Sequence, residues 1–176
     1  MENVLGSPEE IRRRAREHIE KGAITDEYRA DRAKVVELLN QILAIELVCI
    51  LRYKRHFYTV GGINSEGVKK EFAEHALEAQ QHADMVAARI IELNGAPNFN
   101  PDGLAARSLS QYSEASEISA MIKENLIAER IAIEFYTEFV RWIGTDDLTT
   151  RKMMTEILAV EEQHADDMKK LLARHR

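Results

Sequence analysis

The sequence has few of the residues that interrupt or cross-link a chain. It contains 1 cysteine, 3 prolines and 8 glycines among 176 residues. The single cysteine, Cys49, excludes an internal disulfide framework and is consistent with a reducing compartment. The scarcity of proline and glycine, together with 31% charged residues, is typical of long amphipathic helices.

Long apolar runs are also missing. No stretch approaches the roughly 20 apolar residues that a membrane-spanning helix needs. The first residues, MENVLGSPEEIRRRAREH, lack the apolar core of a signal peptide. The formal net charge of -6 argues mildly against nucleic acid as a partner and fits a protein that handles cations. We therefore expect a soluble, cytoplasmic protein without a membrane partner.

Capping residues and apolar periodicity divide the chain into helices. Ser7, Pro8 and Glu10 form a helix start of the capping-box type, which predicts a short helix over 8–21 that stops at Gly22. After a connector, longer periodic segments follow at about 31–60, 65–94, 116–143 and 147–176.

The connectors between the long segments predict the topology. Gly61 and Gly144 mark short turns, so the segments on either side of each turn form a helical hairpin. The middle connector contains Pro97, Pro101 and Gly103 and is long enough to cross the bundle from end to end. Two hairpins joined by one long crossover form an all-α bundle of ferritin-like topology. We expect residues 1–30 to be an N-terminal helix with its connector, and 31–176 to be the four-helix bundle.

Each long segment carries an apolar stripe that an ionisable residue interrupts near its midpoint. The interrupting residues are Glu46, His82, Glu129, Glu161 and His164. A single glutamate of this kind is more often a surface residue, but the midpoints of antiparallel helices of similar length meet. Several buried carboxylates and imidazoles need a cation to neutralise them. This donor set suits iron, manganese or zinc, whereas a buried salt-bridge network is the alternative.

The chain contains an internal sequence repeat that favours a site for two metals. Glu46 is followed seven residues later by Tyr53, and Glu129 seven residues later by Tyr136. The letters QHAD occur twice, once around His82 and once around His164. Two similar hairpins related by a pseudo-twofold axis would build a two-metal site from two half-sites.

Several stretches are similar to a known family. They are LLNQILAIEL (38–47), HAD (82–84), AERIAIE (128–134) and EILAVEEQHADD (156–167). They resemble bacterioferritins and the bacterioferritin-like members of the Dps group over about residues 31–174. The resemblance implies a ferroxidase-type di-iron site, with Tyr53 close to it and these ligands: Glu46, His82, Glu129, Glu161 and His164. Tyr136 is the symmetry-related counterpart of Tyr53.

The second long segment departs from that family pattern. A glutamate is expected three residues before His82, but the residue there is Ala79. Glu78 lies on the other side of the helix face that carries His82, and could act as a ligand only if the helix rotates or its side chain bends inward. His75 is nearly in line with His82, but about two turns away, roughly 10 Å. Half of the site is therefore expected to be weakened.

Three further departures concern haem and assembly. Bacterioferritins bind haem through a methionine that would fall at position 80, where this chain has Gln80, so we expect no haem. The chain stops 12 residues after His164, which leaves no room for the short fifth helix of bacterioferritins and ferritins. Together with the added N-terminal helix, this favours a dodecamer over a 24-mer.

Three functions remain open from the sequence. In the first, a ferroxidase oxidises Fe²⁺ with dioxygen or hydrogen peroxide, and a hollow homo-oligomer stores the iron. In the second, a di-iron or di-manganese oxidoreductase acts on a peroxide or another small substrate. In the third, a ferritin-like protein has a degraded metal site. DNA is not expected as a partner, because the whole chain is acidic and the arginines at 12, 13, 14 and 16 are accompanied by glutamates at 9, 10, 17 and 20.

Overall fold

A computed structural model of the protein describes residues 6–62 and 65–175, and all regular structure in them is helical. None of these helices combines the length and the apolar character needed to span a bilayer. The elements in chain order are α1 (Pro8–Arg14), a 3₁₀ turn (Ile19–Lys21), α2 (Arg32–Thr59), α3 (Ser65–Glu92), α4 (Leu104–Arg107), α5 (Ile118–Ile143) and α6 (Leu148–Arg174).

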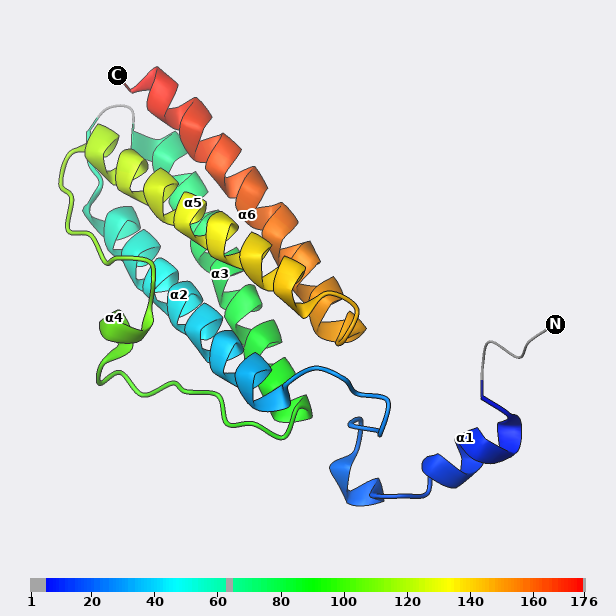
Figure 1. The fold of residues 1–176 in the computed structure, drawn as a ribbon. Coiled ribbons are helices and arrows are strands. Elements are labelled where there is room, and N and C mark those ends of the chain that lie inside the picture. The colour runs from blue at the N-terminus through cyan, green and yellow to red at the C-terminus, as the bar shows by residue number, and fades with distance from the viewer. Residues whose placement is uncertain (1–5, 63–64, 176) are drawn as a thin grey trace.

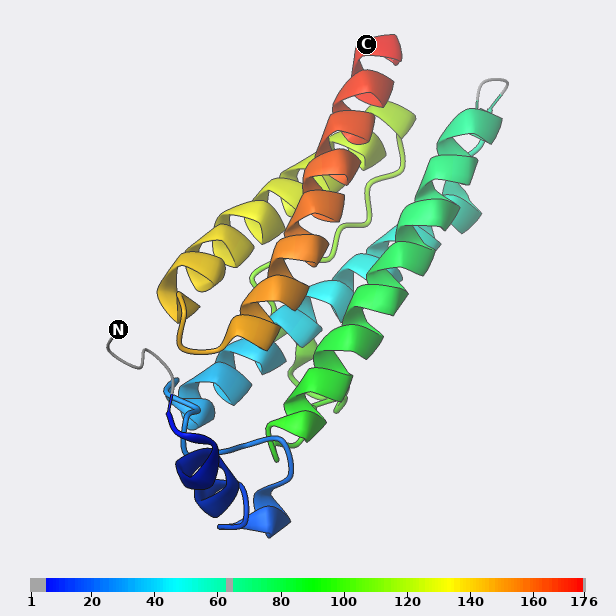
Figure 2. The same ribbon diagram turned by 90° about the vertical axis from the view of Figure 1, so that its right-hand side faces the viewer.

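The four long helices form two hairpins packed against each other (Figure 1). Helix α2 pairs with α3, and α5 pairs with α6; across the bundle, α2 contacts α5 and α3 contacts α6. The crossover, residues 93–117, runs beside α2 from one end of the bundle to the other and contains α4 (Figures 1 and 2). The predicted all-α fold with one long crossover is confirmed.

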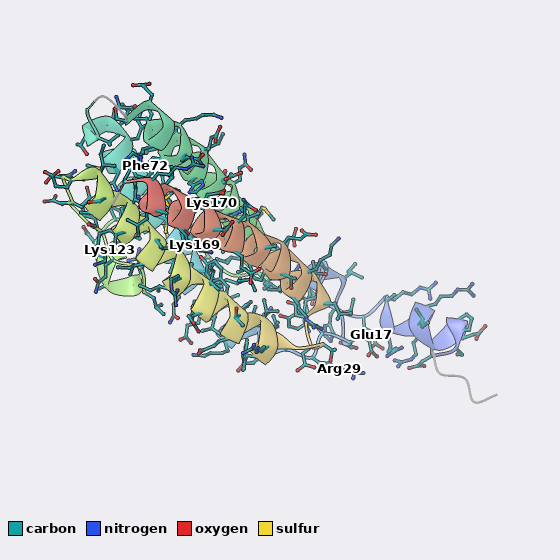
Figure 3. All side chains as sticks on the ribbon, turned by 90° about the horizontal axis from the view of Figure 1, so that it is seen from above. Glu17, Arg29, Phe72, Lys123, Lys169 and Lys170 are labelled. Atoms are coloured by element: carbon teal, nitrogen blue, oxygen red, sulfur yellow. The ribbon has the colours of Figure 1, made fainter. Side chains whose placement is uncertain are left out.

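The N-terminal helix is shorter than the sequence pattern predicts. Ser7 caps it by accepting a hydrogen bond from the backbone of Glu10, but the helix ends at Arg14 instead of Lys21. No residue of α1 is buried, and a helix of 7 residues has little stability without packing. His18 adopts a left-handed backbone conformation (φ 53°), which separates α1 from the following 3₁₀ turn. Figure 3 shows the neighbouring Glu17 beyond the end of the four-helix bundle.

The end of α3 is tightly packed where the crossover begins. Asn94 has a left-handed backbone (φ 56°), and the amide of Gly95 donates to the carbonyl of Ile90. A Cβ atom at Gly95 would lie 2.7 Å from the side chain of Val36 on α2. Glycine is therefore required at this position, because any side chain would push the two helices apart.

The apolar core is divided into two clusters. One includes Leu39, Ile90 and Phe139 near one end of the bundle, and the other includes Phe72 and Met168 near the opposite end. Between these clusters lie the buried residues Glu46, His82, Glu129, Glu161 and His164. The helices are thus held together by apolar contacts on both sides of a polar layer, which fixes the positions of the polar side chains.

Candidate metal centre

The residues that interrupt the four apolar stripes come together at the middle of the bundle. All five residues singled out by the sequence are at least 95% buried: Glu46, His82, Glu129, Glu161 and His164. They form two groups of donors, and in each group one donor atom per residue lies within 4.8 Å of the others.

The first group consists of Glu46 from α2, His82 from α3 and Glu161 from α6. The Nδ1 atom of His82 lies 2.8 Å from Oε1 of Glu161 and 3.7 Å from Oε2 of Glu46. Two carboxylates and one imidazole nitrogen thus point into the same small space, which is a donor set that suits a divalent transition metal.

The second group consists of Glu129 from α5, His164 from α6 and His75 from α3. The rings of His75 and His164 are stacked with their centroids 3.9 Å apart, and the His82 ring lies 6.3 Å from that of His164 on its other side. His75 is the residue that the sequence pattern did not bring into the site. Its axial distance from His82 is large, but His164 from the neighbouring helix fills the space between them.

Glu161 connects the two groups. Its Oε1 atom lies 2.8 Å from Nδ1 of His82, and its Oε2 atom lies 3.3 Å from Nδ1 of His164. One carboxylate therefore presents one oxygen to each imidazole. This is the arrangement that a carboxylate bridging two metal ions requires.

The two tyrosines hold the other carboxylates from across the bundle. The Tyr136 hydroxyl on α5 donates to Oε1 of Glu46 on α2 at 2.5 Å, and the Tyr53 hydroxyl on α2 donates to Oε1 of Glu129 on α5. These two reciprocal hydrogen bonds between α2 and α5 follow the repeated glutamate–tyrosine spacing in the sequence. The Tyr53 hydroxyl also lies 3.1 Å from Nδ1 of His75.

Glu78 contacts the far side of His164. Its Oε2 atom lies 2.6 Å from Nε2 of His164, while Nδ1 of the same ring faces Glu161. A carboxylate that accepts the Nε2 proton orients the ring and makes Nδ1 a better metal donor. In this geometry Glu78 positions His164, and Ala79 is buried within the apolar core.

Hydrogen bonds determine the charges of the central residues. Burial lowers the pKa of His82, but hydrogen bonds to Glu161 and Glu46 outweigh this effect and raise it to about 10. For His164, burial is likewise outweighed by Glu161, and the pKa rises to about 9. Burial raises the pKa of Glu161, but the hydrogen bonds from both histidines hold it below its ordinary value. Both histidines therefore carry a positive charge beside the Glu161 carboxylate when no metal is bound.

The pKa values of Glu46 and Glu129 shift in the opposite direction to that of Glu161. Burial, followed by repulsion from Glu161, raises the pKa of both Glu46 and Glu129. Burial also raises the pKa of Tyr53 and Tyr136, so that both phenols remain neutral hydrogen-bond donors. A metal ion held by these donors would have to displace the protons that they carry here.

Arg52 is a buried cation beside this layer that the sequence pattern did not single out. It is fully buried and donates to Asn125 on α5 and to Ser110 in the crossover. Its charge helps to neutralise Glu129. It also lies 3.2 Å from the Cys49 sulfur, and burial raises the pKa of that thiol to about 12. Cys49 is therefore an unreactive core residue, and Arg52 fixes the crossover to the bundle.

The family of the chain follows from comparison with known proteins. Residues 36–176 match the Ferritin family, described as the ferritin-like domain. The chain belongs to the ferritin-like family. The match covers every residue of the two donor groups, so the buried layer lies within the family domain.

Bacterioferritins and Dps proteins are its relatives within this family of iron-storage proteins. A bacterioferritin from Rhodobacter capsulatus is 27% identical over 135 residues, which cover 76% of this chain and 80% of the relative. The DNA protection during starvation protein of Pyrococcus furiosus is 28% identical over 145 residues, which cover 81% of this chain and 78% of the relative. The resemblance inferred from the sequence motifs is confirmed.

Solved structures agree with this assignment. The bacterioferritin-related protein of Bacteroides fragilis, described as a dodecameric thioferritin, has a TM-score of 0.79 and 31% identity, covering 83% of this chain and 88% of the other. A Dps homologue from Halobacterium salinarum has a TM-score of 0.77 and 26% identity, and the match covers 81% of this chain and 82% of the other. The ferritin-like bundle is thus shared with both branches of the family.

Proposed function

We propose that the chain binds two Fe²⁺ ions in the buried layer, oxidises them with dioxygen or hydrogen peroxide, and keeps the ferric product in a hollow homo-oligomer. The observation that carries this proposal is Glu161, which presents one oxygen to each of the two donor groups. A site for two metals needs such a bridge, because it holds the ions close enough to act as a pair.

The donor groups fit iron by their chemistry. The ligands would be Glu46 and His82 on one ion and Glu129, His164 and His75 on the other, with Glu161 shared. Carboxylates favour the higher charge of Fe³⁺ over Fe²⁺, which assists oxidation. Two Fe²⁺ ions supply the two electrons that reduce dioxygen to hydrogen peroxide, or hydrogen peroxide to water, with the uptake of two protons. Manganese or zinc could occupy the same donors.

Each donor group has three members although Ala79 offers no ligand atom. His75, from the same helix as Ala79, lies beside Glu129 and His164 and is the third donor of that group. This placement supports an active pair of metals over a degraded site. We therefore propose that His75 replaces the missing glutamate, with Glu78 orienting His164.

The surface next to the site favours a cation over an organic substrate. A pocket of about 560 Å³ between α3 and α6 reaches His75 and His164. This volume would admit a small molecule, which a di-iron or di-manganese oxidoreductase requires. Its wall, however, carries the carboxylates of Glu71, Glu78 and Asp167, which would repel an anionic substrate and attract a metal ion.

The assembly follows from the family. The Bacteroides fragilis relative is dodecameric, and we propose a dodecamer for this chain in preference to a 24-mer. A cytoplasmic location without a DNA or membrane partner is also proposed. The arginines of α1 support the part concerning DNA, since Arg13 pairs with Glu10 and Glu17 instead of facing solvent alone. We also propose that no haem binds at position 80, because Gln80 stands where bacterioferritins carry the haem-ligating methionine.

Titration of the metal-free protein with Fe²⁺ in air tests the proposal. Ferric absorbance follows oxidation, and light scattering on the same sample gives the particle mass. We expect about two irons per chain to oxidise quickly, and further iron to remain soluble in a large particle. Oxidation no faster than in buffer, or a halt at one metal per chain, would contradict the paired site. A small particle with rapid turnover of a peroxide would favour the oxidoreductase instead.

A further inference from the structure

The surroundings of the two donor groups are not symmetric. Glu46 and Glu129 are 83 residues apart in the sequence, and so are Tyr53 and Tyr136. At the same spacing, three buried polar residues correspond to apolar residues: Arg52 to Phe135, Asn125 to Ile42 and His56 to Phe139. The two groups therefore have similar ligands but different neighbours.

Arg52 carries a buried charge whose direct partners are all neutral. It is fully buried on α2, and its Nε atom donates to Oδ1 of Asn125 at 2.8 Å. Its other nitrogens donate to the Ser110 hydroxyl, the Gln111 carbonyl and the Cys49 sulfur, at 2.9, 3.1 and 3.2 Å. In the part of the chain that the structure describes, no carboxylate forms an ion pair with this guanidinium. A buried charge of this kind acts through the low-dielectric interior on the nearest other charge.

The second donor group lies next to this charge. Arg52 holds Asn125, which lies one turn before Glu129 on α5. The residue that follows Arg52, Tyr53, donates its hydroxyl hydrogen to Glu129. Burial raises the pKa of Glu129, and the guanidinium of Arg52 acts in the opposite direction. On the side of the first donor group, the position that corresponds to Arg52 is Phe135, an uncharged side chain that packs against the apolar core.

We propose that Arg52 makes the two metal positions unequal by lowering the affinity of the Glu129 group for its ion, more for Fe³⁺ than for Fe²⁺. This inference rests on the proposed function and identifies which of the two ions exchanges. At an effective dielectric constant of about 20 and a separation of roughly 10 Å, a fixed unit charge lowers the affinity about 10-fold for each charge on the ion. The Glu46 group is not opposed in this way, because Phe135 is neutral. The Glu46 group therefore keeps its ion, while the Glu129 group releases the ferric product.

Two substitutions remove this charge in different ways. Arg52→Gln deletes the guanidinium and keeps an amide that can donate hydrogen bonds. Asn125→Asp leaves Arg52 in place and puts a carboxylate oxygen where the amide oxygen accepts from Nε, so that an ion pair neutralises the charge. Arg52→Lys is the matched control, because it changes the hydrogen bonds and keeps the charge. If urea denaturation shows that Arg52→Gln does not fold, Asn125→Asp decides the question, since it retains every partner of the guanidinium.

Calorimetric titration of the metal-free proteins with Zn²⁺ measures the inequality. We expect two ions of unequal affinity in the unaltered protein, and the weaker one should bind at least about 10-fold more tightly in both neutralised variants. The affinity for the tighter ion should change little, and Arg52→Lys should retain the inequality. Crystals soaked with less than one Zn²⁺ per chain identify the positions. In the unaltered protein the anomalous peak at Glu46 and His82 should be the higher of the two, and in the neutralised variants the two peaks should become more equal.

The release of ferric iron provides a second readout. After two Fe²⁺ per chain are oxidised in air, a ferric chelator should remove one ion at least about 10-fold faster than the other from the unaltered protein, and Asn125→Asp should reduce this difference. Two ions of equal affinity in the unaltered protein, or affinities that do not respond to loss of the charge, would overturn the role of Arg52 and leave the proposed function standing. An Arg52→Lys protein that behaves like Arg52→Gln would do the same. Binding of fewer than two ions by the unaltered protein would overturn both.

Discussion

The two halves of the buried layer use the same residue types and differ in their connection to solvent. Glu46 and His82 form the first half, and neither lines the pocket between α3 and α6. In the second half, His164 and His75 both line that pocket, and Glu78 approaches His164 from it. The pseudo-twofold symmetry of the sequence thus produces similar donors with unequal access. Symmetry places the two donor groups, and only the group with His75 and His164 has members that line the pocket.

The largest expected effect comes from removing the residue that both halves share. Glu161→Gln keeps the shape of the side chain but removes the charge that faces His82 and His164. We expect oxidation of Fe²⁺ to slow by about 100-fold or more, since even the loss of an outer partner of a metal ligand costs 10- to 100-fold. Stopped-flow absorbance measures the rate. Glu162 is the exposed neighbour of Glu161, so Glu162→Gln is the control and should leave the oxidation rate unchanged. Two tightly bound irons in Glu161→Gln would show that no bridge is needed.

His75→Ala should separate the two halves. We expect metal affinity in the second half to fall by about 10- to 100-fold while the first half is little affected, so that calorimetric titration with Zn²⁺ resolves one tight ion instead of two. Adding Ala79→Glu to the same chain should restore the second ion by supplying the carboxylate that the family pattern predicts. His56→Ala removes another buried imidazole, which lies outside the donor groups, and controls for loss of stability. Equal weakening of both ions would show that the halves do not act separately.

The stability of the metal-free protein should depend on pH because of the two central histidines. The pKa of His82 is raised to about 10 and that of His164 to about 9, above the ordinary value of 6.5. The contribution of these two histidines to the free energy of unfolding is fully present below pH 6.5 and is lost as pH rises through 9 to 10. The slope is at most about 1.4 kcal/mol per pH unit for each proton. Urea denaturation in the presence of a chelator measures this slope. Saturating Zn²⁺ should abolish it, because the bound ion replaces both protons; a slope that persists would place the protons elsewhere.

The smallest effect should come from the tyrosines, and it should be unequal. Tyr136→Phe removes one hydrogen bond to Glu46, which should lower the free energy of unfolding by about 1 kcal/mol. Tyr53→Phe removes contacts with both Glu129 and His75 and should cost more. Denaturant unfolding of the metal-free proteins measures both, with the half-exposed Tyr112→Phe as the control. Equal losses would argue that His75 does not depend on Tyr53.

Residue spacing was enough to predict much of the site. Glu46, Glu129 and Glu161 each interrupt an apolar stripe near the midpoint of a helix. The position of a residue along its own helix can be counted from the sequence, so the meeting of these three residues could be predicted. His75 could not be found in this way, because its place in the site depends on how His164 from another helix packs beside it. Arg52 was missed for the same reason, since its partners Asn125 and Ser110 lie far along the chain.

The sequence by itself determined the four long helices, their two hairpins, the crossover and the layer of ionisable residues. These follow from periodicity, capping and connector length, which act between neighbours in the chain. The tertiary structure decided how long α1 is, because a helix without core contacts has only its own hydrogen bonds to sustain it. It also decided which oxygen of Glu161 faces which imidazole, and that His75 lies beside Glu129. These depend on the rotation of α3 against α6, which is set by packing across the bundle.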